Sequence, residues 1–239
     1  MTDYNKKVKI LVLGDSGVGK TSLVHILCHD DVLSNPAYTI GCSVEVRLHD
    51  YNKIPSAPSY YIEFWDIGGT LGHEKGRSIF YNSVNGIIAV HDLTNRKSHT
   101  NLRKWISEAL CQSSSNSELS SHSADEIDFD MEKFVGENIP ILVVGTKQDQ
   151  IGTVGGDIEK GSSVAHEAGA EILNVDCTQC HHFAPGSPHM IKLNNFFDKI
   201  IENKFYPKTS HQAHLPLSQI SERKRSTPKK SSWHNFPTD

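Results

Sequence analysis

One octapeptide near the N-terminus constrains the fold of this chain more than any other feature: Gly14-Asp15-Ser16-Gly17-Val18-Gly19-Lys20-Thr21. It fits the pattern G-x-x-x-x-G-K-[ST], and it lies between an apolar run, Val8 to Leu13, and a helical pattern, Lys20 to His29. In such a turn, glycines direct backbone N–H groups inward and the helix N-terminus adds positive charge. The lysine reaches the outer phosphates and the threonine hydroxyl binds Mg²⁺. The motif and the adjoining Ser22 therefore predict a site for a nucleotide diphosphate or triphosphate.

Alternating strand and helix patterns predict an α/β fold. The apolar runs that predict strands are Val8 to Leu13, Tyr60 to Trp65, Gly86 to His91, Ile139 to Val144 and Glu171 to Val175. The patterns that predict helices are Lys20 to His29, Ser98 to Cys111, Asp157 to Ala168 and Met190 to Phe205. From Ser43 to Tyr51, apolar and polar residues alternate, which indicates an antiparallel edge strand. We expect the phosphate-loop (P-loop) NTPase fold, a six-stranded, mostly parallel sheet with one antiparallel edge strand and helices on both faces.

The chain divides into one predicted domain and a tail. With 239 residues, of which 37% are apolar, it is long enough for one α/β domain, which we place at residues 1–206. Residues 112–138 form a predicted insertion that is rich in serine and then acidic from Asp125 to Glu132. The acidic run lacks the spacing and the glycine of an EF-hand, so a solvated loop is favoured over a calcium site. Residues 207–239 are predicted to be a flexible tail with basic clusters at Arg223 to Arg225 and at Lys229-Lys230.

Global composition argues against several classes of function. The formal net charge of -4 and the pI of about 6.4 give no support for nucleic-acid binding. The five cysteines, an odd number, do not suggest a disulfide framework, and the first residues lack a signal-peptide cleavage site. The apolar runs are shorter than the roughly 20 residues that cross a bilayer. We therefore expect a cytoplasmic protein that does not span a membrane.

Two short elements predict the rest of the phosphate and metal site. Trp65-Asp66-Ile67-Gly68-Gly69 follows a predicted strand, which places Asp66 beside the phosphate loop, where it can hold a water on Mg²⁺. Gly69 allows a backbone N–H to approach the terminal phosphate. In Tyr38-Thr39-Ile40-Gly41, the Thr39 hydroxyl can be a second metal ligand when a terminal phosphate is present. Taken alone, such an aspartate is more often a turn former, and such a threonine is more often simply solvated.

A third element predicts selectivity for guanine. Thr146-Lys147-Gln148-Asp149 follows a predicted strand, and the Asp149 carboxylate can accept hydrogen bonds from both N1–H and the exocyclic amine of guanine. Lys147 can lay its methylene stem along the base, and backbone N–H groups of Asp176-Cys177-Thr178 can bind the guanine oxygen. The alternative is a surface turn with a helix-capping aspartate, which the phosphate loop upstream disfavours. A zinc or haem site at Cys177 to His181 is also disfavoured, because zinc needs four suitably spaced ligands.

Together these elements resemble the Ras-like small GTPases, specifically the Rab branch. The resemblance rests on GDSGVGKT, TIG, WDIGG, TKQD and DCT, and it covers roughly residues 6–206. It implies GTP or GDP as ligand and Mg²⁺ as cofactor. It also implies nucleotide contacts from Gly14 to Ser22, at Thr39, from Thr146 to Asp149, and at Cys177 and Thr178. The metal contacts that it implies are at Thr21, Thr39 and Asp66.

The sequence departs from the family pattern at three places. Thr70 follows Gly69 at the position where the family has a glutamine that orients the attacking water, which predicts slow hydrolysis. Thr146 replaces the usual asparagine, whose side chain makes more hydrogen bonds to the phosphate loop and base, which predicts weaker nucleotide binding. The C-terminal residues contain no cysteine for prenylation, so we expect no lipid anchor.

Two functions remain open on this evidence. One is a regulatory GTPase, whose loops around Thr39 and from Asp66 to Ser78 change order with the nucleotide and so change affinity for protein effectors or regulators. The other is a GTP-bound interaction module that hydrolyses essentially nothing and acts as a homodimer. A phosphate-loop kinase is disfavoured, because the turn from Thr146 to Asp149 would then have no role.

Overall fold

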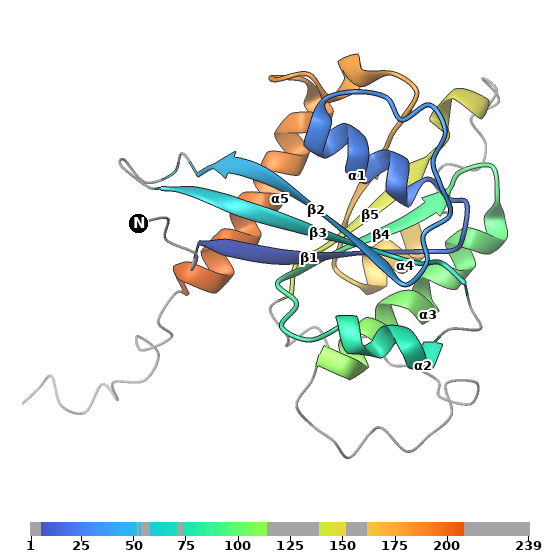
Figure 1. Cartoon of the computed structure of the whole chain (residues 1–239), viewed down its shortest axis with the longest axis horizontal. Helices are drawn as coiled ribbons and strands as arrows, with labels where there is room; N and C mark the ends of the chain where they lie inside the picture. The colour runs from blue at the N-terminus through green and yellow to red at the C-terminus, as the bar shows by residue number, and fades with distance from the viewer. Residues whose placement is uncertain are drawn as a thin grey trace, which may run out of the picture. The chain divides into compact units, whose positions relative to one another are not determined.

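Six strands form one sheet in the order β2-β3-β1-β4-β5-β6 (Figure 1). The computed structural model describes residues 6–51, 53, 58–70, 74–113, 139–151 and 162–207. The strands are β1 (Lys7–Leu13), β2 (Cys42–Asp50), β3 (Ser59–Ile67), β4 (Gly86–Asp92), β5 (Ile141–Thr146) and β6 (Glu171–Asn174). Strands β2 and β3 pair antiparallel, and each other neighbouring pair is parallel. The predicted fold class is confirmed, including the antiparallel edge strand.

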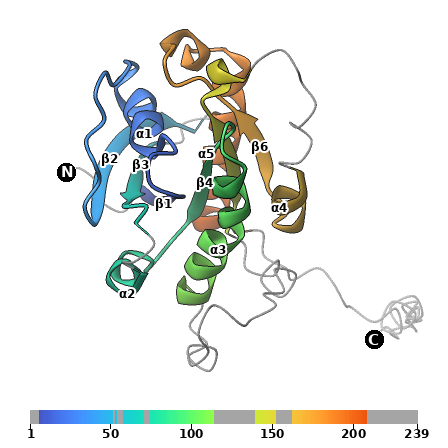
Figure 2. The ribbon, with the colours of Figure 1, turned by 90° about the vertical axis from the view of Figure 1, so that its right-hand side faces the viewer.

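Helices cover both faces of this sheet (Figure 2). They are α1 (Lys20–His29), α2 (Glu74–Arg77), α3 (Arg96–Ser113), α4 (Ser162–Glu167) and α5 (Pro188–Phe205), with 3-10 turns η2 (Ser78–Phe80), η5 (Gln148–Gln150) and η7 (Cys180–Phe183). The residues at the start of α5 favour a helix at this point. Ser187 caps the helix, because its Oγ accepts a hydrogen bond from Met190 N at 3.1 Å, and Pro188 occupies the first helical position. No helix within the described ranges is both long and apolar enough to cross a membrane.

Some predictions fall outside the described residues. They are the first part of the helix predicted from Asp157, most of the insertion at 112–138, and the tail beyond residue 207. The division into a domain at 1–206 and a flexible basic tail therefore stays a prediction.

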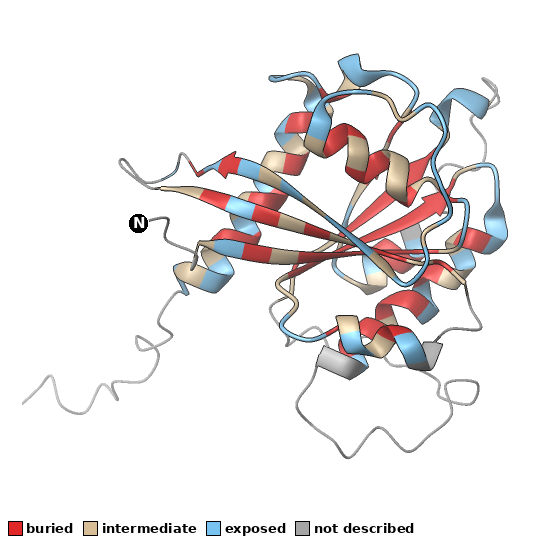
Figure 3. Cartoon of the chain, in the orientation of Figure 1, coloured by how far each residue is buried: buried red, intermediate tan, exposed pale blue. Residues whose placement is uncertain are grey.

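Alternation along β1 divides the core into two layers. Val8, Ile10 and Val12 pack with residues of α1 and α5, whereas Leu11 and Leu13 pack with residues of α3 and α4. Because helices cover both faces, both sets of side chains are buried, as Figure 3 shows along the central strands. Helix α1 follows β1 onto one face and α3 follows β4 onto the other. Such a switch point opens a crevice at the carboxyl ends of the strands, which is where the predicted site residues lie.

Edge strand β2 directs polar residues toward the helices and exposes apolar ones. The exposed side chains are Val44 (47%), Val46 (51%) and Leu48 (57%). The opposite face of the strand is directed at α1 and α5. His49 is buried and its Nε2 lies 2.7 Å from Asp198 Oδ1 of α5. Glu45 Oε2 lies 2.8 Å from His29 Nε2 of α1. Polar contacts to two helices therefore decide which face of this strand is covered.

Candidate nucleotide-binding site

The phosphate loop wraps its backbone around the ammonium group of Lys20. Gly14 and Gly19 have φ angles of 144° and 94°, a region that residues with side chains rarely adopt. Lys20 Nζ donates to Gly14 O at 2.9 Å and to Asp15 O at 2.8 Å. Because an ammonium group has three donors, one is left for a phosphate oxygen. Burial lowers the pKa of Lys20 to about 8, although neighbouring carboxylates oppose the shift. A bound anion would favour the charged form of this buried lysine.

Three predicted metal ligands converge beside Lys20. Asp66 Oδ2 accepts from Thr21 Oγ1 at 2.6 Å and from Thr39 Oγ1 at 3.1 Å, and the two hydroxyl oxygens are 3.0 Å apart. The other carboxylate oxygen, Asp66 Oδ1, is buried and has no hydrogen-bond partner within the described residues. Burial raises the pKa of Asp66, against the opposing effects of the Thr21 hydrogen bond and the Lys20 charge. A buried carboxylate oxygen without a partner, beside two hydroxyls, is a donor set that fits Mg²⁺.

Gly69 lies directly against the phosphate loop. A Cβ atom at Gly69 would be 2.3 Å from Ser16 N and 2.7 Å from Asp15 O. No side chain fits in that space, so glycine is required for the two loops to approach this closely. The structure thus brings the loop after β3 beside the N–H groups that the sequence predicts to bind phosphate.

Thr70, which the sequence predicts to replace a catalytic glutamine, is hydrogen bonded at both its side chain and its main chain. Thr70 Oγ1 lies 2.6 Å from Tyr38 Oη, and Thr70 O accepts from Arg77 Nη1 at 2.8 Å. Hydrogen bonds with Ser16 and Thr70 lower the pKa of the Tyr38 phenol. Tyr38 comes from the loop that carries Thr39. The Thr70 hydroxyl therefore joins that loop to the one that follows β3.

A buried polar network behind the site was not identified from sequence. Asp15 accepts from Asn101 Nδ2 at 2.7 Å and from Trp105 Nε1 at 2.8 Å, which fixes the phosphate loop to α3. Arg77 of α2 makes two hydrogen bonds to Glu108 of α3, at 2.7 and 2.6 Å. The partners are 31 to 90 residues apart in sequence, so no local pattern could have pointed to them.

The turn that the sequence predicts to bind guanine begins with two side chains that are held in place by hydrogen bonds. Thr146 is 1% exposed, and its Oγ1 lies 2.5 Å from Val18 O and 3.0 Å from His91 O. A hydroxyl has one hydrogen, so it can fully satisfy only one of the two carbonyl groups. Lys147, with a φ of 57°, donates through Nζ to Asp92 Oδ2 at 2.6 Å. The role of Asp92 in orienting Lys147 was also missed from sequence, where it had no motif to mark it.

Asp149 lies in η5, with its carboxylate exposed and without a hydrogen-bond partner in the part of the chain that is described. Burial raises the pKa of Cys177 to about 12, with the charges of Asp176 and Asp149 adding to the shift, which places Cys177 near Asp149. The N–H and hydroxyl of Thr178 both donate to Asp176 Oδ1, at 2.7 and 2.6 Å. Thr178 N–H is therefore already engaged, whereas Cys177 N–H has no acceptor among the described residues.

Most of the predicted phosphate and metal residues line one pocket of about 360 Å³, although Gly14, Asp15, Val18 and Asp66 do not. Its walls are Ser16, Gly17, Gly19, Lys20, Thr21, Ser22, Pro36, Ala37, Tyr38, Thr39, Gly69 and Lys147. The predicted residues Asp149, Cys177 and Thr178 are not part of this lining. The pocket thus combines a lysine, hydroxyls and backbone N–H groups, a set suited to bind phosphate and a divalent cation.

Known proteins resemble this chain over most of its length. Residues 9–120 match the family model described as Ras of Complex, Roc, domain of DAPkinase. The chain is 47% identical over 215 residues to Rab-like protein 3 of Homo sapiens. The matched residues make up 86% of this chain and 89% of that protein. The chain belongs to the Ras-like small GTPases, as a Rab-like member. It is therefore a GTP-binding regulatory protein by family.

More distant relatives support the same assignment of this Rab-like GTPase. Rab-like protein 3 of Danio rerio is 44% identical over 226 residues, covering 92% of this chain and 94% of that protein. Small GTPase LIP1 of Arabidopsis thaliana is 37% identical over 166 residues, covering 66% of this chain and 45% of that protein.

Proposed function

We propose that this Rab-like GTPase binds GTP and GDP with Mg²⁺ and acts as a nucleotide-dependent regulator of signalling or of other small GTPases, with slow intrinsic hydrolysis. The observation that carries the proposal is the convergence of Thr21, Thr39 and Asp66 beside the buried Lys20. Magnesium, when bound, neutralises charge on the outer phosphates. The chain itself contributes the third donor of Lys20, the N–H groups of the phosphate loop, and the Asp149 carboxylate for guanine.

Thr39 supports a regulatory role because it belongs to a loop rather than to the sheet. Its hydroxyl contacts Asp66 at 3.1 Å, which supports a shared role for the two side chains in holding a metal ion on a terminal phosphate. Loss of that phosphate would remove the contact between the Thr39 hydroxyl and the metal, and with it one interaction that orders the loop. Protein effectors or regulators that contact the loops around Thr39 and from Asp66 to Ser78 would then distinguish the two nucleotide states.

Slow hydrolysis follows from the side chain at residue 70. A glutamine amide can both donate to and accept from an attacking water, and it extends farther than a threonine hydroxyl. The hydroxyl of Thr70 is already within 2.6 Å of Tyr38 Oη. It is therefore poorly placed to orient a water molecule for attack.

The second candidate function is an essentially non-hydrolysing, GTP-bound interaction module that acts as a homodimer. The Thr70–Tyr38 contact favours it, because that contact occupies the catalytic position with a structural hydrogen bond. Exposed apolar side chains on the adjoining loop and edge strand also favour it: Ile40 (86%), Val44 (47%), Val46 (51%) and Leu48 (57%). An apolar strip of this kind suits contact with another protein chain.

Single-turnover hydrolysis of GTP with Mg²⁺ separates the two candidates. We expect slow turnover by the wild type and an increase on the order of tenfold or more in Thr70→Gln, which supplies the missing amide. Thr70→Ala is the matched control, because it removes the contact with Tyr38 without adding an amide, and it should not gain activity.

Three other outcomes would each count against part of this proposal. Turnover in Thr70→Gln with none in the wild type would favour the interaction module, and sedimentation of the same GTP-loaded samples should then detect a dimer. Comparable turnover in all three proteins would contradict the role assigned to residue 70. Absence of bound nucleotide would contradict the whole proposal.

A further inference from the structure

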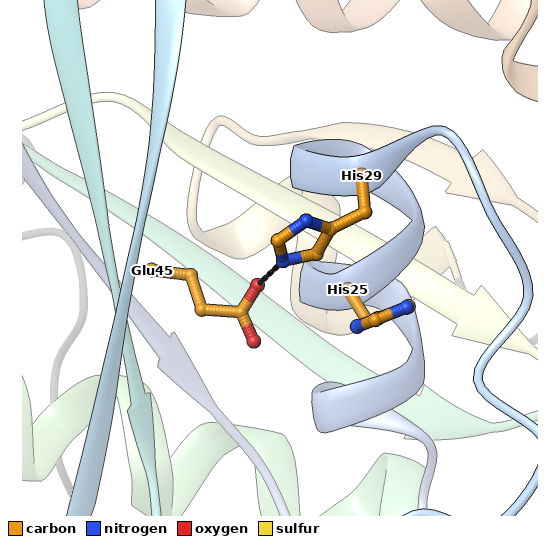
Figure 4. A group of neighbouring side chains, drawn as sticks. All are labelled: His25, His29 and Glu45. Atoms are coloured by element: carbon orange, nitrogen blue, oxygen red, sulfur yellow. Dashed lines mark hydrogen bonds and ion pairs between the residues drawn. The ribbon is translucent and has the colours of Figure 1, made fainter.

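Three side chains that could bind a metal lie together outside the nucleotide pocket. They are His25 and His29 of α1 and Glu45 of β2, and one ligand atom of each lies within 4.8 Å of the others. Figure 4 shows them facing the same gap between α1 and β2, with His25 one helical turn before His29. His29 Nε2 is 2.8 Å from Glu45 Oε2, and the two imidazole centroids are 4.5 Å apart.

The sequence and the packing of β2 together produce this cluster. Histidines four residues apart share one face of a helix, a spacing that zinc sites on helices use. Glu45 reaches them because β2 directs its polar face at α1. Arg47, two residues further along the same face, donates to Leu27 O at the end of α1 and lies 3.5 Å from Asp30. The strand and the helix are thus held in register by contacts other than the histidines.

We propose that His25, His29 and Glu45 form a Zn²⁺ site that ties α1 to β2. Zinc bonds to nitrogen and oxygen of about 2.0–2.2 Å place two ligands of one tetrahedral ion about 3.4 Å apart. The His29–Glu45 contact of 2.8 Å needs to open only slightly for zinc to replace the shared hydrogen. The side chain of His29 is 54% exposed, so it can rotate to close the site. Water supplies the fourth ligand.

The ligand types decide which metal binds. Two imidazoles and one carboxylate suit zinc, whereas Mg²⁺ and Ca²⁺ prefer all-oxygen sites. The Mg²⁺ site at Thr21 and Asp66 is built from oxygen atoms and is a separate site. Zinc at His25, His29 and Glu45 joins the helix that follows the phosphate loop to the strand that follows the Thr39 loop. The ion would therefore close the chain segment from His29 to Glu45 and stabilise the folded state.

Equilibrium dialysis against buffered Zn²⁺ tests the site on the purified full-length protein, with GDP and excess Mg²⁺ present. We expect the wild type to bind one more zinc ion per chain than His25→Ala or His29→Ala. Glu45→Gln should weaken binding at this site on the order of tenfold, since a neutral amide replaces a charged ligand. Zinc should also raise the melting temperature of the wild type, should raise that of Glu45→Gln by less, and should leave that of His25→Ala and His29→Ala unchanged.

Two other histidine variants serve as controls. His166 is exposed on α4, so His166→Ala should leave zinc binding unchanged. His182 lies in a second group of rings, with its centroid 4.2 Å from His181 and 5.4 Å from His189. Equal zinc binding by the wild type and all three site variants, or a loss confined to His182→Ala, would overturn the proposal. Circular dichroism checks folding. If a histidine variant unfolds, Glu45→Gln carries the test, because glutamine has nearly the same volume as glutamate.

Discussion

Thr146 attaches the phosphate loop to strand β5 through a single hydroxyl group. Its one hydroxyl hydrogen is shared between Val18 O at 2.5 Å and His91 O at 3.0 Å. Thr146→Asn supplies two N–H donors at the same position. We expect a gain on the order of fivefold in GDP affinity, equivalent to about 1 kcal/mol for one added hydrogen bond. The release rate of a fluorescent GDP analogue measures it.

The conservative control at this position is Thr146→Ser, which keeps the single hydroxyl. It should release GDP at nearly the wild-type rate. A faster release from Thr146→Asn than from the wild type would show that the pocket around Gly19 has no room for the longer side chain.

His91 makes the stability of the fold sensitive to pH. The residue is 4% exposed, its Nδ1 has no partner among the described residues, and the ring of His99 lies 4.9 Å away. Burial, with a smaller contribution from His99, lowers the pKa of His91 to about 4. Between pH 4 and the ordinary value of about 6.5, the unfolded chain therefore binds a proton that the folded protein excludes. Within that interval, the unfolding free energy must rise with pH.

Urea denaturation at pH 7 and pH 5 tests this effect. From the pKa values, His91 should account for a loss of roughly 2 kcal/mol of unfolding free energy on acidification. His91→Gln removes the titrating group and should lose less stability than the wild type over the same interval. An identical loss in both proteins would show that His91 is protonated in the folded state.

At the scale of elements, the short helix α2 is anchored to α3 by a buried ion pair. Arg77 is 3% exposed, and it makes two hydrogen bonds to Glu108 and stacks 4.2 Å from the Trp105 ring. Glu108→Ala leaves the guanidinium buried without its carboxylate. We expect a loss of about 3–5 kcal/mol in unfolding free energy, measured by urea denaturation.

A second ion pair on α3 provides the comparison. Arg103 and Glu167 are 51% and 39% exposed, so solvent screens their attraction. Glu167→Ala should cost no more than about 1 kcal/mol. If the two alanine variants lose equal stability, α2 is not held by the buried pair.

Element types followed from sequence, but the orientation of β2 did not. Apolar periodicity predicted α1 and the central strands because burial on a helix or strand leaves a local repeat. In β2 the repeat was visible, yet its apolar residues Val44 and Val46 face solvent. The covered face was decided by His49 and Asp198, which are 149 residues apart in sequence. Such long-range partners leave no trace in a local pattern.

The candidate site also has one part that could be predicted from sequence and one part that could not. The phosphate loop could be predicted because its residues are contiguous and each type has a defined role in binding phosphate. The contacts Tyr38–Thr70 and Asp15–Trp105 join segments that are far apart in sequence, and they became visible only in the fold. Sequence therefore indicated the groups that we propose to bind ligand, but it did not indicate the side chains that hold those groups in position.

At the scale of the whole molecule, the sheet separates two hydrophobic layers, and the candidate site lies at the carboxyl ends of its strands. One layer contains residues of α1 and α5, and the other contains residues of α3 and α4. The phosphate loop leads into the first layer through Lys20 and is fastened to the second through Trp105. A ligand in the pocket therefore contacts parts of the molecule that both layers position, and it stabilises the folded state by mass action.

The binding of GDP and of XDP, the xanthine analogue, tests the assignment of the site most directly. It is measured for the wild type and for Asp149→Asn, with Lys20→Ala as the phosphate-loop control. We expect the wild type to prefer GDP, because Asp149 accepts from two guanine donors. We expect Asp149→Asn to prefer XDP, because the amide can donate to the oxygen that replaces the guanine amine. Lys20→Ala should bind both nucleotides poorly. An unchanged preference for GDP in Asp149→Asn, together with unchanged affinity in Lys20→Ala, would contradict the assignment of the site.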